Sequence, residues 1–349
     1  MGYATGRIQV ISSGSEGFID QIANWIATLR LQVSDRVLKT IPDERGTVAV
    51  ALLIGDRGTI PERILMAMRD SELAHLLAIS GLHVGLFAGL LLAVSRNLLA
   101  LAVPLALRYP VKKWAAVFSL AGAFGYLLMT GGTIPTQRAF LMITLGLLAI
   151  VFDRIPISMT VVAWVAIGLL LTSPEILLSA GFQMSFGAVV ALISMYEVLG
   201  STIRRFRSRA GAWHRGALYL VGVLLTTLIA SLATAPFAAF HFNRIAVYGL
   251  AANLVAVPIM ALWTMPSALV TYLLFPTGWY EWALTPMIWG ISIILEVAQT
   301  VESWPGAVHL VPAMPVSYLA VTALSGLWLC IWTTKSCGYW AWGEWWLGS

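Results

Sequence analysis

The chain has 349 residues, of which 59% are hydrophobic and only 11% are charged, and its formal net charge is +5. Because soluble globular domains carry about 25% charged residues, this composition excludes a soluble globular protein. The two cysteines, Cys330 and Cys337, do not have the spacing of a zinc site. The sequence also lacks the Gly-x-x-x-x-Gly-Lys phosphate loop and the His/Asp clusters of metallohydrolases. We therefore expect an all-α polytopic membrane protein with no catalytic residues, no metal site and no cofactor.

The first 72 residues differ from the rest, because acidic and basic residues are frequent there and nearly balance. Residues 1–10 are strand-like and lack the basic and apolar regions of a signal peptide. From Phe18 to Leu38 apolar residues recur every three or four positions, which predicts an amphipathic helix that ends before Pro42. Two further short helices are expected, one at Val48–Ile54 and one starting near Pro61.

Apolar stretches long enough to cross a bilayer then follow one another to the end of the chain. We predict about nine transmembrane helices, at residues 73–95, 114–130, 138–152, 157–173, 175–199, 217–240, 246–275, 283–301 and 316–333. The segment 246–275 is long and contains Pro258 and Pro266, which predicts two half-helices or a re-entrant pair. The predicted fold is therefore a helical bundle with broken or re-entrant segments, preceded by a short amphipathic N-terminal region.

Clusters of basic residues in the loops predict the orientation of the bundle. Five arginines without an acidic residue lie in one loop, at positions 204, 205, 207, 209 and 215. The loop from Arg96 to Lys113 is the second richest in basic residues, and an even number of predicted spans separates the two loops. Both loops are therefore expected on the cytoplasmic side, by the positive-inside rule. Residues 19–72 and the loop Gly131–Arg138 are then expected outside the cytoplasm.

The first predicted span opens with three polar residues, His75, Ser80 and His83. A bilayer core offers no water, so these side chains need partners or an aqueous cavity. The two histidines are eight residues apart, which places them about 80° around one helix. We predict that this part of the span faces protein or a pore rather than lipid.

Small residues in two spans predict close helix packing. Gly81, Gly85 and Gly89 recur every fourth residue, so they leave one face of the first span without side chains. Gly181, Ser185 and Gly187 are small residues that also permit close packing in the span 175–199. Such faces allow a second helix to approach closely in a membrane.

Other polar residues lie inside or beside the predicted spans. Arg138 follows a tight turn at a span boundary, where it either reaches the lipid headgroups or forms a cationic mouth of an anion pathway. Gln183 is costly in a span unless it bonds another helix or lines a pore. His241 and Arg244 close one span and Asn253 interrupts the next. From these residues alone, the sequence predicts the membrane core of a channel or a transporter.

Four ordered segments resemble the transmembrane competence domain of the ComEC family, the bacterial inner-membrane channels that import single-stranded DNA during natural transformation. They are His75-Leu-Leu-Ala-Ile-Ser-Gly-Leu-His-Val-Gly85, Pro135-Thr-Gln-Arg-Ala139, Ser179-Ala-Gly-Phe-Gln-Met-Ser-Phe186 and Asn253-Leu-x-Ala-Val-Pro258. Gly55-Asp56-Arg57 is similar to the turn that precedes the first of them in that family.

The resemblance implies a division of the chain into four parts. Residues 1–18 resemble a remnant of an extracytoplasmic OB-like domain, residues 19–72 are amphipathic helices, residues 73–333 are the transmembrane competence domain, and residues 334–349 are an irregular Trp-rich tail. The metallo-β-lactamase-like domain common in the family has no counterpart in this chain, so no enzyme activity is expected.

The resemblance also implies a role for the polar residues and a set of partners. The candidates for lining a DNA pathway are His75, Ser80, His83, Gln183, Ser185, His241 and Asn253. Arg138 and Arg244 are the candidates for contact with phosphates. The implied partners are single-stranded DNA, an extracytoplasmic DNA-delivery protein, a cytoplasmic ATP-dependent motor and the lipid bilayer, with a homo-oligomer left open.

Two alternatives remain at this point. A small-solute secondary transporter would place its site at the broken helix around Asn253–Pro258 and would use an acidic coupling residue, for which the spans offer Glu197 and Glu296. A non-conducting fragment of the DNA channel is the other alternative.

Overall fold

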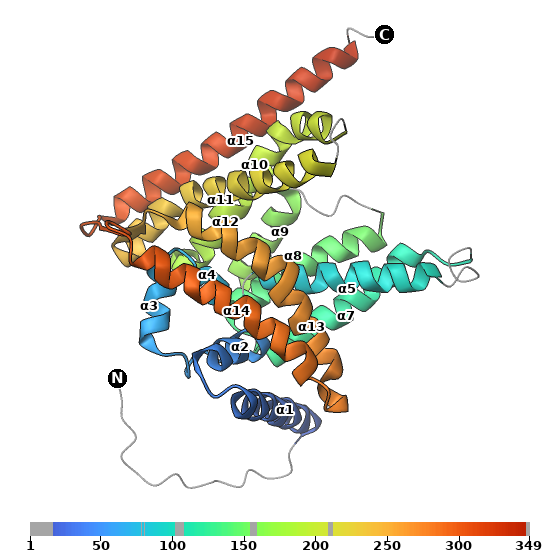
Figure 1. Cartoon of the computed structure of the whole chain (residues 1–349). Helices are drawn as coiled ribbons and strands as arrows, with labels where there is room; N and C mark the ends of the chain where they lie inside the picture. Colours follow the sequence, from blue (N-terminus) through green and yellow to red (C-terminus); the bar gives the residue numbers. More distant parts are fainter. Residues whose placement is uncertain are drawn as a thin grey trace.

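The computed structural model describes residues 17–77, 79, 81–101, 108–153, 159–208 and 212–346, and almost all of them are helical (Figure 1). The predicted OB-like remnant lies almost entirely outside these residues. Ser80 and Arg209 also lie outside the described residues, as do the side chains of the other arginines in the basic loop 204–215.

The helices follow one another along the chain as α1 Phe18–Thr40, α2 Glu44–Ile54, α3 Glu62–Asp70, α4 Ala74–Leu77, α5 Gly81–Leu101, α7 Val111–Met129, α8 Ile134–Val151, α9 Met159–Thr172, α10 Ala180–Ser208, α11 Ala212–Phe242, α12 Gly249–Ile259, α13 Met265–Leu274, α14 Glu281–Glu302 and α15 Val316–Trp346. In Figure 1, α5, α7 and α8 lie side by side, α10, α11 and α15 form a second group, and α12 to α14 cross between the two groups. Two short strands, β1 (Arg244–Ala246) and β2 (Val308–Leu310), pair antiparallel with Arg244 opposite Leu310.

Each of the nine predicted spans lies mainly in a described helix or helical run, so the order of the apolar segments is confirmed, although 73–95 also contains the break at Ile79 and 175–199 the turn before α10. Five of the described helical segments are both long and apolar enough to cross a membrane, namely Gly81–Leu101, Ala180–Gly200, Gly216–Phe242, Gly249–Thr277 and Glu281–Glu302. Three more apolar helices are shorter, at Pro135–Val151, Met159–Thr172 and Val316–Trp332. The chain is thus an all-α protein with the composition of a membrane protein, and a total of nine spans remains a prediction.

The segment 246–275 is not divided into half-helices. Helices α12 and α13 are joined by a π-helical turn, Met260–Thr264, that keeps the run helical past Pro258 and Pro266. A proline removes one backbone donor, and the wider π turn accommodates that loss without breaking the helix. The prediction of a broken or re-entrant segment is therefore wrong here.

Helix α2 is also different from the prediction. All residues from Val48 to Ile54 are buried, so α2 is a core helix rather than an amphipathic one. It packs against α1, α4 and α14, and two tyrosines bond its last turn: Tyr126 donates to the Leu52 carbonyl at 3.0 Å, and Tyr272 donates to the Leu53 carbonyl. The uninterrupted apolar run from Val48 to Ile54 explains this burial, because it leaves no polar face for water.

The C-terminal end continues the last helix. The backbone of α15 is helical as far as Trp346, whereas the sequence predicted an irregular tail from residue 334. No proline occurs between Val316 and Trp346, so nothing in this stretch removes a backbone donor from the helix.

Candidate functional site

Three of the sequence segments that resemble one family, 55–57, 75–85 and 135–139, meet in space around residues 72–83, and we call this region the motif junction. Gly55 lies there with a φ of +77°, and a Cβ atom at this position would be 2.6 Å from the Thr130 carbonyl oxygen and 3.4 Å from Ile79 Cδ1. Only glycine fits both the left-handed backbone and this close approach. The turn at Gly55-Asp56-Arg57 is therefore held against the end of α7 and the segment between α4 and α5.

A second motif reaches the motif junction through Thr136. Its hydroxyl donates a hydrogen bond to the Ile79 carbonyl at 3.5 Å and is 2.8 Å from the hydroxyl of Thr133. Ile79 belongs to neither neighbouring helix, because α4 ends at Leu77 and α5 begins at Gly81. This break corrects the prediction that His75 and His83 share one helix: the Ile79 carbonyl bonds a side chain of α8.

The two histidines have different environments. His83 is fully buried in α5, whereas His75 is exposed and its Nδ1 lies 2.9 Å from the Glu72 carbonyl oxygen. His75 and Arg57 are both close enough to His83 to act on it electrostatically. Arg57 is exposed to solvent, and desolvation by the protein around it lowers the pKa of its guanidinium. The motif junction thus gathers three basic side chains, of which sequence reasoning had not included Arg57.

Arg138 is the most buried cation of the candidate set. Its side chain is 4% exposed, and within the described part of the chain its Nε and Nη1 atoms have no hydrogen-bond partner. Its Nη2 atom would lie 3.3 Å from a Cβ atom placed on Gly181, so the guanidinium faces the first turn of α10. Arg244 is different, because its Nη1 pairs with Asp70 Oδ1 at 2.7 Å. Of the two phosphate-contact candidates, Arg138 has unused donors.

Two other candidates contact each other across the α10–α11 pair. His241 Nε2 lies 2.8 Å from Gln183 Oε1, and Gln183 Nε2 donates to the Leu177 carbonyl at 3.0 Å. The helices approach closely near Gly187, where a Cβ atom would be 3.1 Å from the Phe237 ring. Ser185 is partly buried on α10.

Glu72 is the residue of the motif junction that sequence reasoning missed. It has a φ of +64°, and its Oε1 accepts a hydrogen bond from the Ser231 hydroxyl of α11 at 2.7 Å. Burial raises the pKa of this carboxyl, and the bond from Ser231 opposes that rise. Its Oε2 lies against Gly249 of α12, where a Cβ atom would be only 1.5 Å away. The available signal was an acidic residue directly before the first apolar span.

Asn253 extends this contact along α12. The residue is 3% exposed and its Nδ2 donates to the Gly249 carbonyl at 2.9 Å. Its Oδ1 is buried without a partner in the part of the chain that the structure describes. Asn253 therefore lies one helical turn from the glycine that receives Glu72, which links its motif to the same junction.

The predicted glycine seam of α5 is not where α5 packs most closely. A Cβ atom on Gly81 or Gly89 would have no described atom within 4 Å, and on Gly85 it would meet only Ile143 Cδ1 at 3.9 Å. The close contact with α7 is offset, because a Cβ atom on Gly122 would lie 2.2 Å from Leu91 Cδ1. The close approach of α5 and α7 therefore depends on Gly122 of α7 rather than on the glycines of α5.

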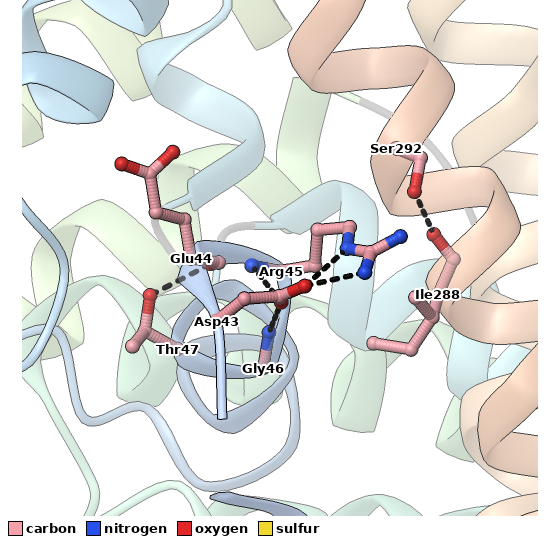
Figure 2. Close-up of polar contacts among 7 residues, drawn as sticks. All are labelled: Asp43, Glu44, Arg45, Gly46, Thr47, Ile288 and Ser292. Atoms are coloured by element: carbon pink, nitrogen blue, oxygen red, sulfur yellow. Dashed lines mark hydrogen bonds and ion pairs between the residues drawn. The ribbon is translucent and has the colours of Figure 1, made fainter. Parts of the chain in front are cut away.

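A second polar region lies at the start of α2. Asp43 Oδ1 accepts hydrogen bonds from the backbone amides of Arg45 (2.9 Å) and Gly46 (3.3 Å), and the Arg45 guanidinium pairs with the other carboxylate oxygen. This guanidinium lowers the pKa of Asp43. Figure 2 shows the Arg45 side chain extending from α2 toward Ser292 of α14. An open cavity of about 390 Å³ separates the two helices, with Glu296 and Gln299 on its far wall.

No cluster of three or more His, Cys, Asp or Glu side chains among the described residues is arranged to hold a metal ion. What this part of the structure offers instead is the exposed cationic side chain of Arg57 and the buried, unpaired guanidinium nitrogens of Arg138. Such groups bind anions, and they bind phosphate-bearing polymers where an aqueous path leads past them.

Comparison with known proteins identifies the family. The model of the Competence protein family matches residues 52–336. ComE operon protein 3 of Bacillus subtilis is 26% identical over 280 residues, which are 78% of this chain and 33% of that protein. Competence protein ComA of Neisseria gonorrhoeae is 36% identical over 188 residues, 52% of this chain and 26% of that protein. Recombination protein 2 of Haemophilus influenzae is 27% identical over 256 residues, 72% of this chain and 31% of that protein.

The chain spans about a third or less of the length of these curated relatives. No solved structure matches it. The family model covers more than half of the chain, including every segment that meets at the motif junction. The chain belongs to the Competence protein family.

Proposed function

We propose that this chain is the membrane core of a channel that imports single-stranded DNA through the bacterial inner membrane during natural transformation. The observation that carries the proposal is the buried and unpaired guanidinium of Arg138, which in this Competence family member lies against the first turn of α10. The relatives, which include a competence protein and a recombination protein, fit this role.

The physical requirement is an aqueous path with polar walls and cations at its mouths, because a polyanion cannot cross hydrocarbon. Arg138 is the candidate for phosphate contact, and His75, His83, Gln183 and His241 are the candidates for lining the path. Arg244 is a weaker candidate, because a phosphate would compete with Asp70 for its guanidinium. The chain conducts passively in this proposal.

The driving force then comes from partners. A cytoplasmic ATP-dependent motor pulls the strand, and an extracytoplasmic DNA-delivery protein presents it. The N-terminal segment lies outside the cytoplasm and the loop 200–216 inside it, as the basic loops indicate. Assembly into a homo-oligomer is part of the same proposal.

Uptake of labelled DNA in a transformable host that lacks its own channel gene tests this function. The chain is supplied alone and also as a chimera in which residues 52–336 replace the matching segment of the host channel. We expect the chimera to restore uptake, and Arg138→Ala and His83→Leu to abolish it, whereas the exposed Arg69→Ala has no effect. A chimera that inserts into the membrane and supports no uptake would overturn the proposal.

A small-solute transporter is less well supported. It predicts half-helices around Asn253–Pro258, and the run from α12 to α13 is continuous.

A further inference from the structure

The first turn of α10 presents backbone donors that have no partner. The N-terminal amides of an α-helix lack intrahelical acceptors. Here the Phe182 amide donates to the Ser179 hydroxyl at 3.3 Å and the Gln183 amide donates to the Ser179 carbonyl at 3.1 Å. The amides of Ala180 and Gly181 have no acceptor among the described residues. Two donors at a helix N-terminus therefore remain unused.

The Arg138 guanidinium faces the same turn. A Cβ atom on Gly181 would be 3.3 Å from Nη2 and 3.9 Å from both Nη1 and Cζ, so any side chain there would occupy the space in front of the guanidinium. Arg138 is 4% exposed, and its Nε and Nη1 have no partner in the part of the chain that is described. Burying an unpaired cation costs several kcal/mol, and an anion bound at this position removes that cost.

We propose that Arg138 together with the Ala180 and Gly181 amides forms an oxyanion site that holds one phosphodiester group of the translocating strand. Nη1 and Nη2, the guanidinium nitrogens nearest Gly181, and the two amides supply four donors, which suits a phosphate with several acceptor oxygens. The single charge of a phosphodiester matches the single charge of Arg138. Gly181 is required because it lets the guanidinium lie against the backbone of this turn, where a Cβ atom would be 3.3 Å from Nη2. This inference rests on the proposed function, because the strand is its source of phosphate.

The test uses the full chain in nanodiscs of zwitterionic lipid and two probes, inorganic phosphate and a fluorescent oligothymidylate. The thermal midpoint is measured in phosphate and in chloride of equal ionic strength, and oligonucleotide affinity is measured over a salt series. The variants are Arg138→Gln and Gly181→Ala. Their matched controls are Arg69→Gln, at an exposed ion pair, and Gly168→Ala, where a Cβ atom meets nothing within 4 Å.

We expect phosphate to stabilise the wild type and both controls but neither site variant. Arg138→Gln should lower oligonucleotide affinity about 10-fold, as for one lost charged hydrogen bond, and reduce the slope of log affinity against log salt by about 0.7. Gly181→Ala should act in the same direction while keeping its thermal midpoint in chloride, because alanine favours the helix.

Three results would overturn the inference, and they separate it from the proposed function. If phosphate stabilises all variants alike while the wild type binds the oligonucleotide, the site is wrong and the DNA channel proposal stands. If phosphate stabilisation depends on Arg138 but no oligonucleotide binds, the strand is not the occupant and the proposed function fails with it. If the variants differ from wild type only in nanodiscs of phosphatidylglycerol, the occupant is a lipid headgroup.

Discussion

Gly249→Ala should disrupt the contact between Glu72 and α12. A Cβ atom at position 249 would lie 1.5 Å from Oε2, 2.5 Å from Cδ and 2.6 Å from Cβ of Glu72. Rotation of the Glu72 side chain relieves the first two contacts but not the third, because the Cβ atom moves only with the backbone. Either the Glu72 backbone or α12 must therefore shift, and the bond from Ser231 is lost with the rotation.

The expected destabilisation follows from three contributions. Overpacking a tight contact costs about 1–3 kcal/mol, and loss of the Ser231 hydrogen bond costs about 1–2 kcal/mol. The higher helix propensity of alanine offsets up to about 1 kcal/mol. We expect Gly249→Ala to lower the free energy of unfolding by about 1–5 kcal/mol.

Denaturation of the purified chain in detergent, followed by tryptophan fluorescence, measures this loss. A second variant combines Gly249→Ala with Glu72→Gly, which removes the clashing side chain and suits the φ of +64° at position 72. The double variant should be more stable than Gly249→Ala alone, and Gly168→Ala serves as the control without a close neighbour. If Gly249→Ala is as stable as the wild type, or if Glu72→Gly gives no rescue, the packing argument is refuted.

Four further results are expected. Burial raises the pKa of Glu72 in the folded protein. The contribution of its carboxyl to stability is therefore complete below the unfolded pKa of about 4.3 and is lost as the pH rises through the folded pKa. In melting curves, Glu72→Gln should have a higher midpoint than the wild type at pH 8 and should lose that advantage at pH 4. Asp43→Ala removes the N-cap of α2 and should lower the free energy of unfolding by about 1 kcal/mol. Because Arg45 lowers the pKa of Asp43, the wild type should lose this advantage only when the pH falls below the usual range of an aspartate pKa. An unchanged thermal midpoint at pH 7 would contradict the capping role. Arg138→Met removes a buried cation whose Nε and Nη1 have no described partner. It should raise the thermal midpoint in chloride buffer and abolish DNA uptake. A lower midpoint would show that the guanidinium has hydrogen-bond partners in the folded protein. Gln183→Leu should cost about 1 kcal/mol by removing the contact between α10 and α11, with Ser185→Ala as a neighbouring control in the same denaturation series.

Much of the fold could be predicted from the sequence because hydropathy is a local property. Runs of apolar residues located every helix from α5 to α15, and the residues of the competence motifs identified the family before any contact was known. The predictions were wrong where one local sequence pattern is compatible with more than one position in the folded protein. The run Val48–Ile54 is equally compatible with an interfacial helix and a core helix, and only its burial against α14 decides for the core.

The sequence predicted which residues belong to the candidate site but not how they are arranged in space. Arg138, Gln183 and His241 were selected by their polarity within apolar spans, and the Gln183–His241 contact confirms only that these two lie together. Glu72 and Arg57 were missed because each precedes the spans, where charged residues are ordinary. The break at Ile79 was missed because the hydrogen bond that its carbonyl accepts comes from Thr136, a residue 57 positions away.

The sequence by itself determined the membrane class, the order of the helices and the family, because hydropathy, loop charge and motif residues are properties of single segments. Only the tertiary structure decided which polar groups are paired. Arg138 and Arg244 are alike in sequence, yet one pairs with Asp70 and the other lies buried against the first turn of α10. The reason is that the free energy of a charge depends on its neighbours in space, and those neighbours come from distant parts of the chain.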